Sequence, residues 1–298
     1  MLAIANYAMK GPMQATIAAV LFSALSVFLA PFGILVGAII ALVTLRIDVT
    51  EGFKTLVWSV VSHTALTLMI SGSYFPAVIS ILEYMLPVWL MAVVLRQTNS
   101  LALALQFAMI LVGLGIVLFY LTVPSPAEWW LTLFNQYVAP MLEASQISYN
   151  KEIIPNLAEM VTMLMAVFMI ILWFSILVVA RWWQSELYNP GRFKTDFYEL
   201  ALPRTTAYMA IALAVIGLIS GTQPGLVYDL SGIIIAGLMF QGLAIAHQTV
   251  AIKQLNSAWL VGLYVLLFLF PQAMLVLATI GLVDNWVDFR NRWDNKEL

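Results

Sequence analysis

Residues 100–122, SLALALQFAMILVGLGIVLFYLT, form an apolar run of helical length that contains no charged side chain. A helix needs about 20 mostly apolar residues to cross the roughly 30 Å hydrocarbon core of a bilayer. An uncharged run of this length predicts a transmembrane helix rather than a buried helix of a soluble domain. This stretch therefore predicts a helical membrane protein, and the rest of the chain can be tested against that prediction.

The overall composition agrees with a membrane protein. The chain has 298 residues, of which 63% are hydrophobic and only 9% are charged, whereas a soluble domain has roughly 45–50% apolar and 25% charged residues. Further apolar runs fall at about 13–30, 33–45, 54–72, 75–95, 158–180, 205–221, 230–251 and 257–283. We therefore expect residues 1–298 to form one all-α integral membrane domain, a polytopic bundle with eight or nine spans.

Two prolines leave the number of spans open. The runs on either side of Pro31 form either a hairpin turning at residues 30–33 or one long helix kinked at Pro31, because proline breaks the helical hydrogen-bond pattern. The last run contains Pro271, and a chain that folds back there would place its C-terminus on the other side of the membrane.

Several classes of function are excluded by composition. The net charge of −2 and the dispersed 13 Lys and Arg residues provide no basic surface for nucleic acid. The absence of cysteine rules out disulfides and thiolate ligands, and two histidines far apart in sequence disfavour a metal site. No G-x-x-x-x-G-K-[ST] motif is present, so any ATP-driven step would need another subunit. We expect no cofactor and no enzymatic activity.

The distribution of Lys and Arg predicts the orientation, because cytoplasmic loops of membrane proteins are enriched in both. Lys10 is the only charge before the first apolar run, which continues past the length of a cleavable signal. We expect an uncleaved protein of a bacterial inner membrane with a cytoplasmic N-terminus. Residues 123–157, with paired tryptophans, should be an extracytoplasmic interfacial segment or a lid, and 181–204 a cytoplasmic loop. The tail charges Arg290, Arg292 and Lys296 fit this orientation poorly.

Three motifs carry a family resemblance. They are ARWWQSELYNPGRFKTDFYELALP at 180–203, ALVTLR at 41–46 and GLVDNWVDFRNRW at 281–293. Together they resemble the bacterial YybS-like family of uncharacterised multi-pass membrane proteins. A looser similarity in fold links this family to the membrane-embedded substrate-binding subunits of energy-coupling-factor transporters, which meet a partner through a small-xxx-small face near the N-terminus.

The second resemblance implies partner-binding positions. Small residues stand at that spacing in two rows, which are Ala15, Ala19 and Ser23, and Gly33, Gly37 and Ala41. Close packing of helices inside the chain is the alternative explanation for both rows. The turn signal Tyr188, Asn189, Pro190 and Gly191 is a second candidate for partner binding, or else a plain hairpin at the membrane surface.

A polar pair marks the candidate substrate site. His63 and Glu83 each lie ten residues from the turn at 72–74, so both are expected about 15 Å from it, near the bilayer midplane. Ser59 and Thr67 add hydroxyls beside His63. An intramembrane carboxylate is costly unless it is paired, hydrated or neutral. Glu83 is therefore a neutral hydrogen-bonding group, a substrate or proton site, or a catalytic acid or base.

Other intramembrane polar residues favour structural roles. Gln241 and Gln248 share a helix face, His247 lies near the cytoplasmic edge, and Gln272 follows the helix-breaking Pro271. We expect an interfacial histidine and an amide that satisfies backbone carbonyls.

Three functions remain open. The first is a membrane subunit that binds or transports a small molecule. The second is a scaffold that recruits a membrane or cytosolic protein through residues 181–204. A membrane enzyme is the third.

Overall fold

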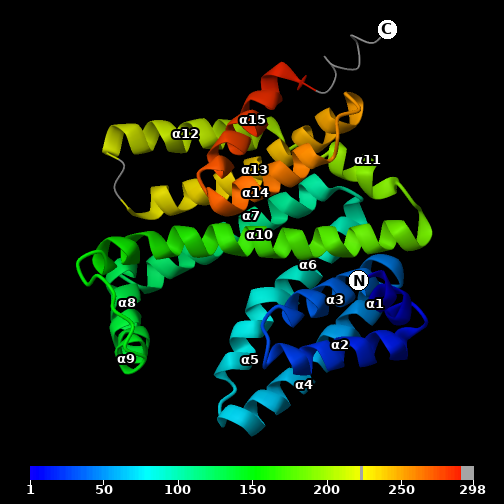
Figure 1. Ribbon diagram of the computed structural model, residues 1–298, viewed down its shortest axis with the longest axis horizontal. Coiled ribbons are helices and arrows are strands. Elements are labelled where there is room, and N and C mark those ends of the chain that lie inside the picture. The colour runs from blue at the N-terminus through cyan, green and yellow to red at the C-terminus, as the bar shows by residue number, and fades with distance from the viewer. Residues whose placement is uncertain (222–223, 290–298) are drawn as a thin grey trace. The chain divides into compact units, whose positions relative to one another are not determined.

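The computed structural model describes residues 1–221 and 224–289, and every regular element in these ranges is a helix (Figure 1). The predicted all-α membrane bundle is confirmed. The tail charges Arg290, Arg292 and Lys296 and the end of the 281–293 motif lie outside the described residues.

Contacts between residues divide the chain into two compact units. Unit 1 comprises Met1–Ala108 and Ile171–Ala201, and unit 2 comprises Met109–Ile170 and Leu202–Leu298. Unit 1 contains α1 (Leu2–Ala8), α2 (Pro12–Ser26), α3 (Phe32–Arg46), α4 (Val49–Ser71), α5 (Phe75–Ser80), η1 (Ile81–Met85), α6 (Leu86–Thr98), the start of α7 (Leu101–Thr122), the C-terminal half of α10 (Ile154–Tyr188) and α11 (Arg192–Tyr198). Unit 2 contains the rest of α7 and α10 with α8 (Pro126–Leu133), η2 (Phe134–Val138), α9 (Ala139–Ala144), α12 (Arg204–Ser220), α13 (Leu226–Ile252), α14 (Ala258–Leu269) and α15 (Ala273–Val287).

Within residues 1–221 and 224–289, five helical stretches are long and apolar enough to cross a membrane. They are α4, the continuous stretch Phe75–Thr98, α7, α10 and α13. Five shorter apolar helices, α2, α3, α12, α14 and α15, account for the remaining runs. Each apolar run of the sequence therefore corresponds to one helical stretch, except that 257–283 is divided between α14 and α15, and half of these stretches are shorter than a full span.

The two prolines act as helix breaks. Helix α2 ends at Ser26 and α3 begins at Phe32, with Pro31 as its N-cap residue, and the two helices pack together. The first two runs therefore form a hairpin, and the alternative of one long kinked helix is wrong. Pro271 likewise separates α14 from α15.

Two π-helical turns, η1 and η2, each end two residues before a proline, Pro87 or Pro140. A proline removes one backbone donor and its ring clashes with the carbonyl four residues earlier, and a wider turn makes room for it. Because of η2, residues 126–144 form an almost continuous helix rather than an irregular loop (Figure 1).

Helix α3 forms the centre of unit 1. Its residues 36–45 are buried, and it packs against α2, α4 and α6. The next helix, α4, begins at an N-cap, where the Asp48 carboxylate accepts a hydrogen bond from the Thr50 amide at 3.0 Å. This bond holds the pKa of Asp48 below its usual range.

Candidate functional site

His63 belongs to a closed hydrogen-bonded cluster in unit 1. Its Nδ1 lies 3.0 Å from the carbonyl oxygen of Ser23 and 3.4 Å from Ser26 Oγ, and Ser26 Oγ lies 3.0 Å from the Tyr84 hydroxyl. Because Ser26 donates its hydrogen to the Ser23 carbonyl at 2.7 Å, Tyr84 is the donor to Ser26. His63 is only 2% exposed. Nδ1 of His63, the Ser26 hydroxyl and the Tyr84 hydroxyl are therefore joined in one hydrogen-bonded cluster.

The predicted neighbours of His63 satisfy helix carbonyls. Ser59 donates to the Thr55 carbonyl and Thr67 donates to the His63 carbonyl, while Ser23 donates across to the Ser59 carbonyl. The Ser23 bond joins α2 to α4, and the three bonds together leave these hydroxyls without a free proton for a ligand. The assignment of Ser59, Thr67 and His63 to a substrate site remains a prediction.

Glu83 does not join this cluster. The carboxylate is half-buried and makes no hydrogen bond or ion pair within the described part of the chain. Instead, the Glu83 backbone carbonyl accepts a 2.5 Å hydrogen bond from Trp173 Nε1. Pro87, four residues later, lacks the N–H that would bond this carbonyl in an α-helix. Contrary to our expectation, therefore, it is Tyr84 and not Glu83 that meets the His63 cluster.

The rows of small residues pack inside unit 1. Ala15, Ala19 and Ser23 are completely buried against neighbouring helices. A Cβ atom on Gly33 would lie 2.8 Å from the Tyr84 ring, and one on Gly37 would lie 2.9 Å from Ile176. Burial at these positions leaves no surface for a second protein, so internal packing replaces the partner-binding assignment for Ala15, Ala19, Gly33 and Gly37.

The predicted turn after α10 is present and exposed. Asn189, Pro190 and Gly191 are exposed, and Gly191 has a φ of +89°. Ser185 fixes the turn, because its hydroxyl donates to the Asn189 carbonyl and accepts from the Phe193 amide, both at 2.9 Å. The turn is therefore held firmly by buried groups while its tip remains open.

Tyr188 ties this turn to the end of α3. The guanidinium of Arg46 lies 3.9 Å from the centre of the Tyr188 ring, and Gln184 donates to the Leu45 carbonyl. Beside the turn, Asp196 pairs with Arg181 and Arg192. Two of the motifs that carry the family resemblance, 41–46 and 180–203, thus meet in unit 1.

Gln241 is a structural link in unit 2. It is 1% exposed, its Oε1 accepts from the Leu202 amide at 3.0 Å, and its Nε2 donates to Asp284 at 3.1 Å. The expectation that Gln241 plays a structural role agrees with these bonds.

The other polar residues of unit 2 lie apart from Gln241. His247 Nε2 lies 2.9 Å from the Tyr264 hydroxyl, which joins α13 to α14. The buried Oε1 of Gln248 has no hydrogen-bond partner in the described part of the chain. Gln272 is the exposed N-cap residue of α15, and its side chain makes no capping bond. Its predicted role in satisfying a carbonyl is not seen.

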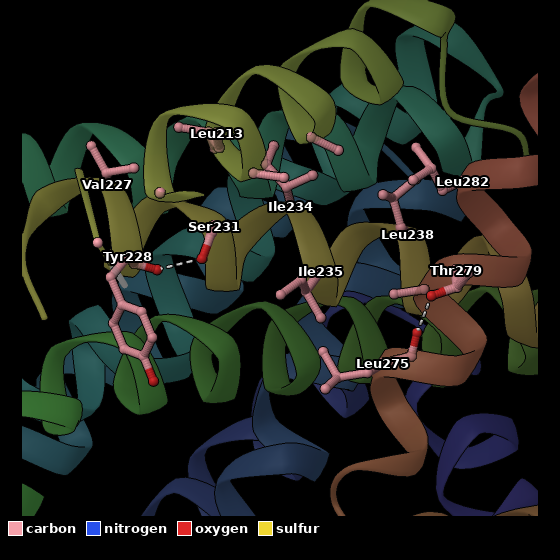
Figure 2. A pocket seen from close by; sticks show the side chains of 15 residues that line it. Leu213, Val227, Tyr228, Ser231, Ile234, Ile235, Leu238, Leu275, Thr279 and Leu282 are labelled. Carbon is pink, nitrogen blue, oxygen red and sulfur yellow. Dashed lines mark hydrogen bonds between the residues drawn. The ribbon is translucent and has the colours of Figure 1, made fainter. Parts of the chain in front are cut away.

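Unit 2 contains an apolar cavity of about 400 Å³ between α12, α13 and α15 (Figure 2). Among the residues that the structure describes, no charged side chain lines it, and the polar side chains there are Tyr228, Ser231 and Thr279. Ser231 donates to the Tyr228 carbonyl and Thr279 to the Leu275 carbonyl, so both hydroxyls keep only acceptor capacity toward the cavity (Figure 2).

The sequence did not predict this cavity, because aliphatic residues that line a cavity and those that fill a core have the same pattern. Gly217 of α12 is the clearest mark of the empty space. Gly217 lines the cavity, and a Cβ atom placed on it would point into open space, with no other atom within 4 Å. The size and the lining fall in the range of small-molecule sites, which are mostly apolar with few polar groups.

Asp229 is a second feature that was not predicted from the sequence. It is 1% exposed near the start of α13, and its Oδ2 accepts a 2.7 Å hydrogen bond from the Tyr120 hydroxyl on α7. The residue lies one position before the run assigned to 230–251, and its partner is 109 residues away. Only the proximity of an aspartate to an apolar run could have drawn attention to it.

Comparison with known proteins gives one match. Residues 134–285, just over half of the chain, match the family described as Predicted membrane protein (DUF2232). No curated protein and no solved structure matches the chain. The matched range includes the 180–203 motif and all of α10, α12, α13 and α14. The chain therefore belongs to the DUF2232 family of predicted membrane proteins.

Proposed function

We propose that this protein is a non-enzymatic membrane subunit that binds a small, largely apolar molecule in the cavity between α12, α13 and α15. The observation that carries the proposal is the cavity of about 400 Å³ within a membrane-embedded unit, lined without charge. Because burying a charge without a partner is costly, the part of the ligand that lies in the cavity should be uncharged. The hydroxyls of Ser231 and Thr279 would accept a hydrogen bond from one polar group of that ligand.

The cavity replaces the His63 cluster as the preferred binding site. His63 and its partners are buried and bonded to one another, which supports a role in holding helices together. Transport of the bound molecule, a bacterial inner membrane location and the relationship to YybS-like proteins and energy-coupling-factor subunits remain part of the proposal. A transport step driven by ATP would require a separate ATPase partner.

Filling the cavity tests the proposal. The full chain, purified from its own membrane in a gentle detergent, is examined by native mass spectrometry for bound molecules. Gly217→Phe places a ring in the open space that Gly217 faces, and should remove a molecule that the wild type retains. Gly115→Phe is the matched control, since Gly115 is an exposed glycine of α7 outside the cavity with equally open surroundings.

Two results would contradict the proposal. One is a wild-type protein that carries nothing beyond exchangeable bilayer lipid. The other is a bound molecule retained equally by Gly217→Phe and Gly115→Phe.

The exposed turn at Asn189–Gly191 supports a second candidate, a scaffold that recruits a cytosolic or membrane protein. The turn has an open tip on a fixed base. Scrambling residues 188–191 should then release a co-purifying protein and leave any molecule in the cavity in place. A partner that stays bound after scrambling would remove this candidate.

A further inference from the structure

Asp229 is a buried carboxyl in a membrane-embedded helix that the proposed binding function does not use. The side chain is 1% exposed on the first turns of α13. An ionised carboxylate at such a position requires a cation, several hydrogen-bond donors or water. The groups around Asp229 therefore decide whether its carboxyl is ionised or protonated.

These groups provide one side-chain hydrogen-bond donor, and the backbone amide of Met163 on α10 also lies near the carboxyl. The Tyr120 hydroxyl donates to Oδ2 at 2.7 Å, and Oδ1 has no hydrogen-bond partner within the described part of the chain. From α10, Met163 packs against Gly232, one turn along α13, while Glu159 is exposed. The neighbouring titratable residue on α13 is Tyr228, which lines the cavity. No Lys, Arg or His forms an ion pair with Asp229 in the described ranges.

A proton fits this site better than a metal cation. Sodium, magnesium and calcium need several oxygen ligands, typically about six for the divalent ions, whereas Asp229 and Tyr120 offer three oxygens. A neutral carboxyl leaves one hydroxyl without a partner, which costs far less than a buried charge with a single side-chain donor. The dipole of α13 favours negative charge near its start, but by much less than burial disfavours it.

We propose that Asp229, buried at the start of α13, is a proton-binding site that carries its proton on Oδ1 at neutral pH, with Tyr120 donating to Oδ2. Loss of the proton would leave a charge that only water or a cation could stabilise, so the first turns of α13 would have to open. Tyr228 and Ser231, on the same turns, line the cavity. Proton release at Asp229 would therefore disturb the wall of the cavity, although the proton site itself does not depend on a ligand there.

Infrared spectroscopy of the full chain in lipid nanodiscs at neutral pH tests this proposal. Protein labelled with ¹³C at the aspartate side-chain carboxyl should show a C=O stretching band of a protonated acid that shifts on labelling. The band should disappear in Asp229→Asn and persist in Glu83→Gln, which is the control for another intramembrane carboxyl. In Tyr120→Phe the band should persist at higher frequency, because Oδ2 loses its donor.

Three outcomes would overturn the proposal. They are the absence of any label-sensitive band of a protonated acid, a band that persists unchanged in Asp229→Asn, and a loss of only ionised-carboxylate bands in that variant. The third outcome, with a response to added sodium, would identify a cation site instead. If Asp229→Asn does not fold, the labelled wild type and Tyr120→Phe still decide the question. No ligand is added in the infrared experiment, so a negative result for Asp229 does not contradict the cavity proposal. A negative result in the ligand-binding test does not contradict the proton site at Asp229.

Discussion

At the scale of single residues, the hydrogen bond from Trp173 to the Glu83 carbonyl explains how unit 1 tolerates a proline inside a spanning stretch. Pro87 withholds the backbone N–H that an α-helix would aim at this carbonyl. The buried indole of Trp173, 6% exposed, donates at 2.5 Å instead. In a membrane no water can replace a missing donor. One side chain therefore compensates for a defect in the backbone of another helix.

A double-mutant cycle would test this compensation. We expect Trp173→Phe to lower the free energy of unfolding by about 1–3 kcal/mol, the cost of an unsatisfied buried polar group. In a Pro87→Ala background the loss should be smaller, because alanine at this position supplies an N–H to the same carbonyl. Thermal unfolding in detergent provides the measurement, and Trp129→Phe, at a 40% exposed tryptophan, is the control. An equal loss in both backgrounds would show that ring packing alone accounts for the effect.

At the scale of helices, the backbones of α13 and α15 pack very closely in unit 2. A Cβ atom on Gly242 would overlap the Leu277 carbonyl oxygen, and one on Gly281 would overlap the Leu238 carbonyl oxygen. The two backbones touch directly, as small residues allow in membrane helices. Since α13 and α15 form two of the cavity walls, this contact also fixes the position of the cavity.

The contact can be tested with a single methyl group. Gly242→Ala should destabilise the protein by about 1–3 kcal/mol, because the Leu277 backbone must move. Gly115→Ala, at an exposed glycine with no neighbour within 4 Å, should be neutral or slightly stabilising. Melting temperatures of the two variants in the same detergent make the comparison. Equal melting temperatures would mean that the helices are not in backbone contact.

At the scale of the whole molecule, α10 is the helix that connects residues 123–157 to residues 181–204 along the chain. Its 35 residues span about 52 Å, well beyond a hydrocarbon core of roughly 30 Å. Residues before α10 and residues after it should therefore reach opposite sides. The bias of Lys and Arg predicts that the 181–204 loop is cytoplasmic and that residues 123–157 lie on the other side.

The lack of cysteine makes this orientation easy to measure. Lys194→Cys and Glu143→Cys place single thiols at exposed positions after and before α10. A membrane-impermeant maleimide should label Glu143→Cys on intact right-side-out vesicles and Lys194→Cys only on inverted ones. Detergent-solubilised protein, in which both thiols must react, is the control. Labelling of both thiols from one side would refute the orientation.

The sequence predicted the helices and the Asn189–Gly191 turn, because apolar length, proline and glycine act locally, and it left open whether the helices break at Pro31 and Pro271. It did not predict which polar groups meet. Counting residues from the 72–74 turn gave a common depth for His63 and Glu83 but not a common face. Glu83 and Tyr84 are neighbours in the π-helical turn η1, and it is the Tyr84 hydroxyl that reaches Ser26 of the cluster. Asp229 and Tyr120 are 109 residues apart, and only the fold brings them together.

The C-terminal end of α3 has a consequence for biosynthesis. Arg96 donates to the carbonyls of Thr44, Leu45 and Ile47, and Gln184 also donates to Leu45. Arg96 follows Thr44 by 52 residues and Gln184 follows Leu45 by 139. At about 5–20 residues per second, these donors leave the ribosome roughly 3–10 s and 7–28 s after the carbonyls they bind. During translation α3 therefore enters the bilayer before the donors to its C-terminal carbonyls have been made. Unit 1 can complete its packing only after most of the chain has been inserted.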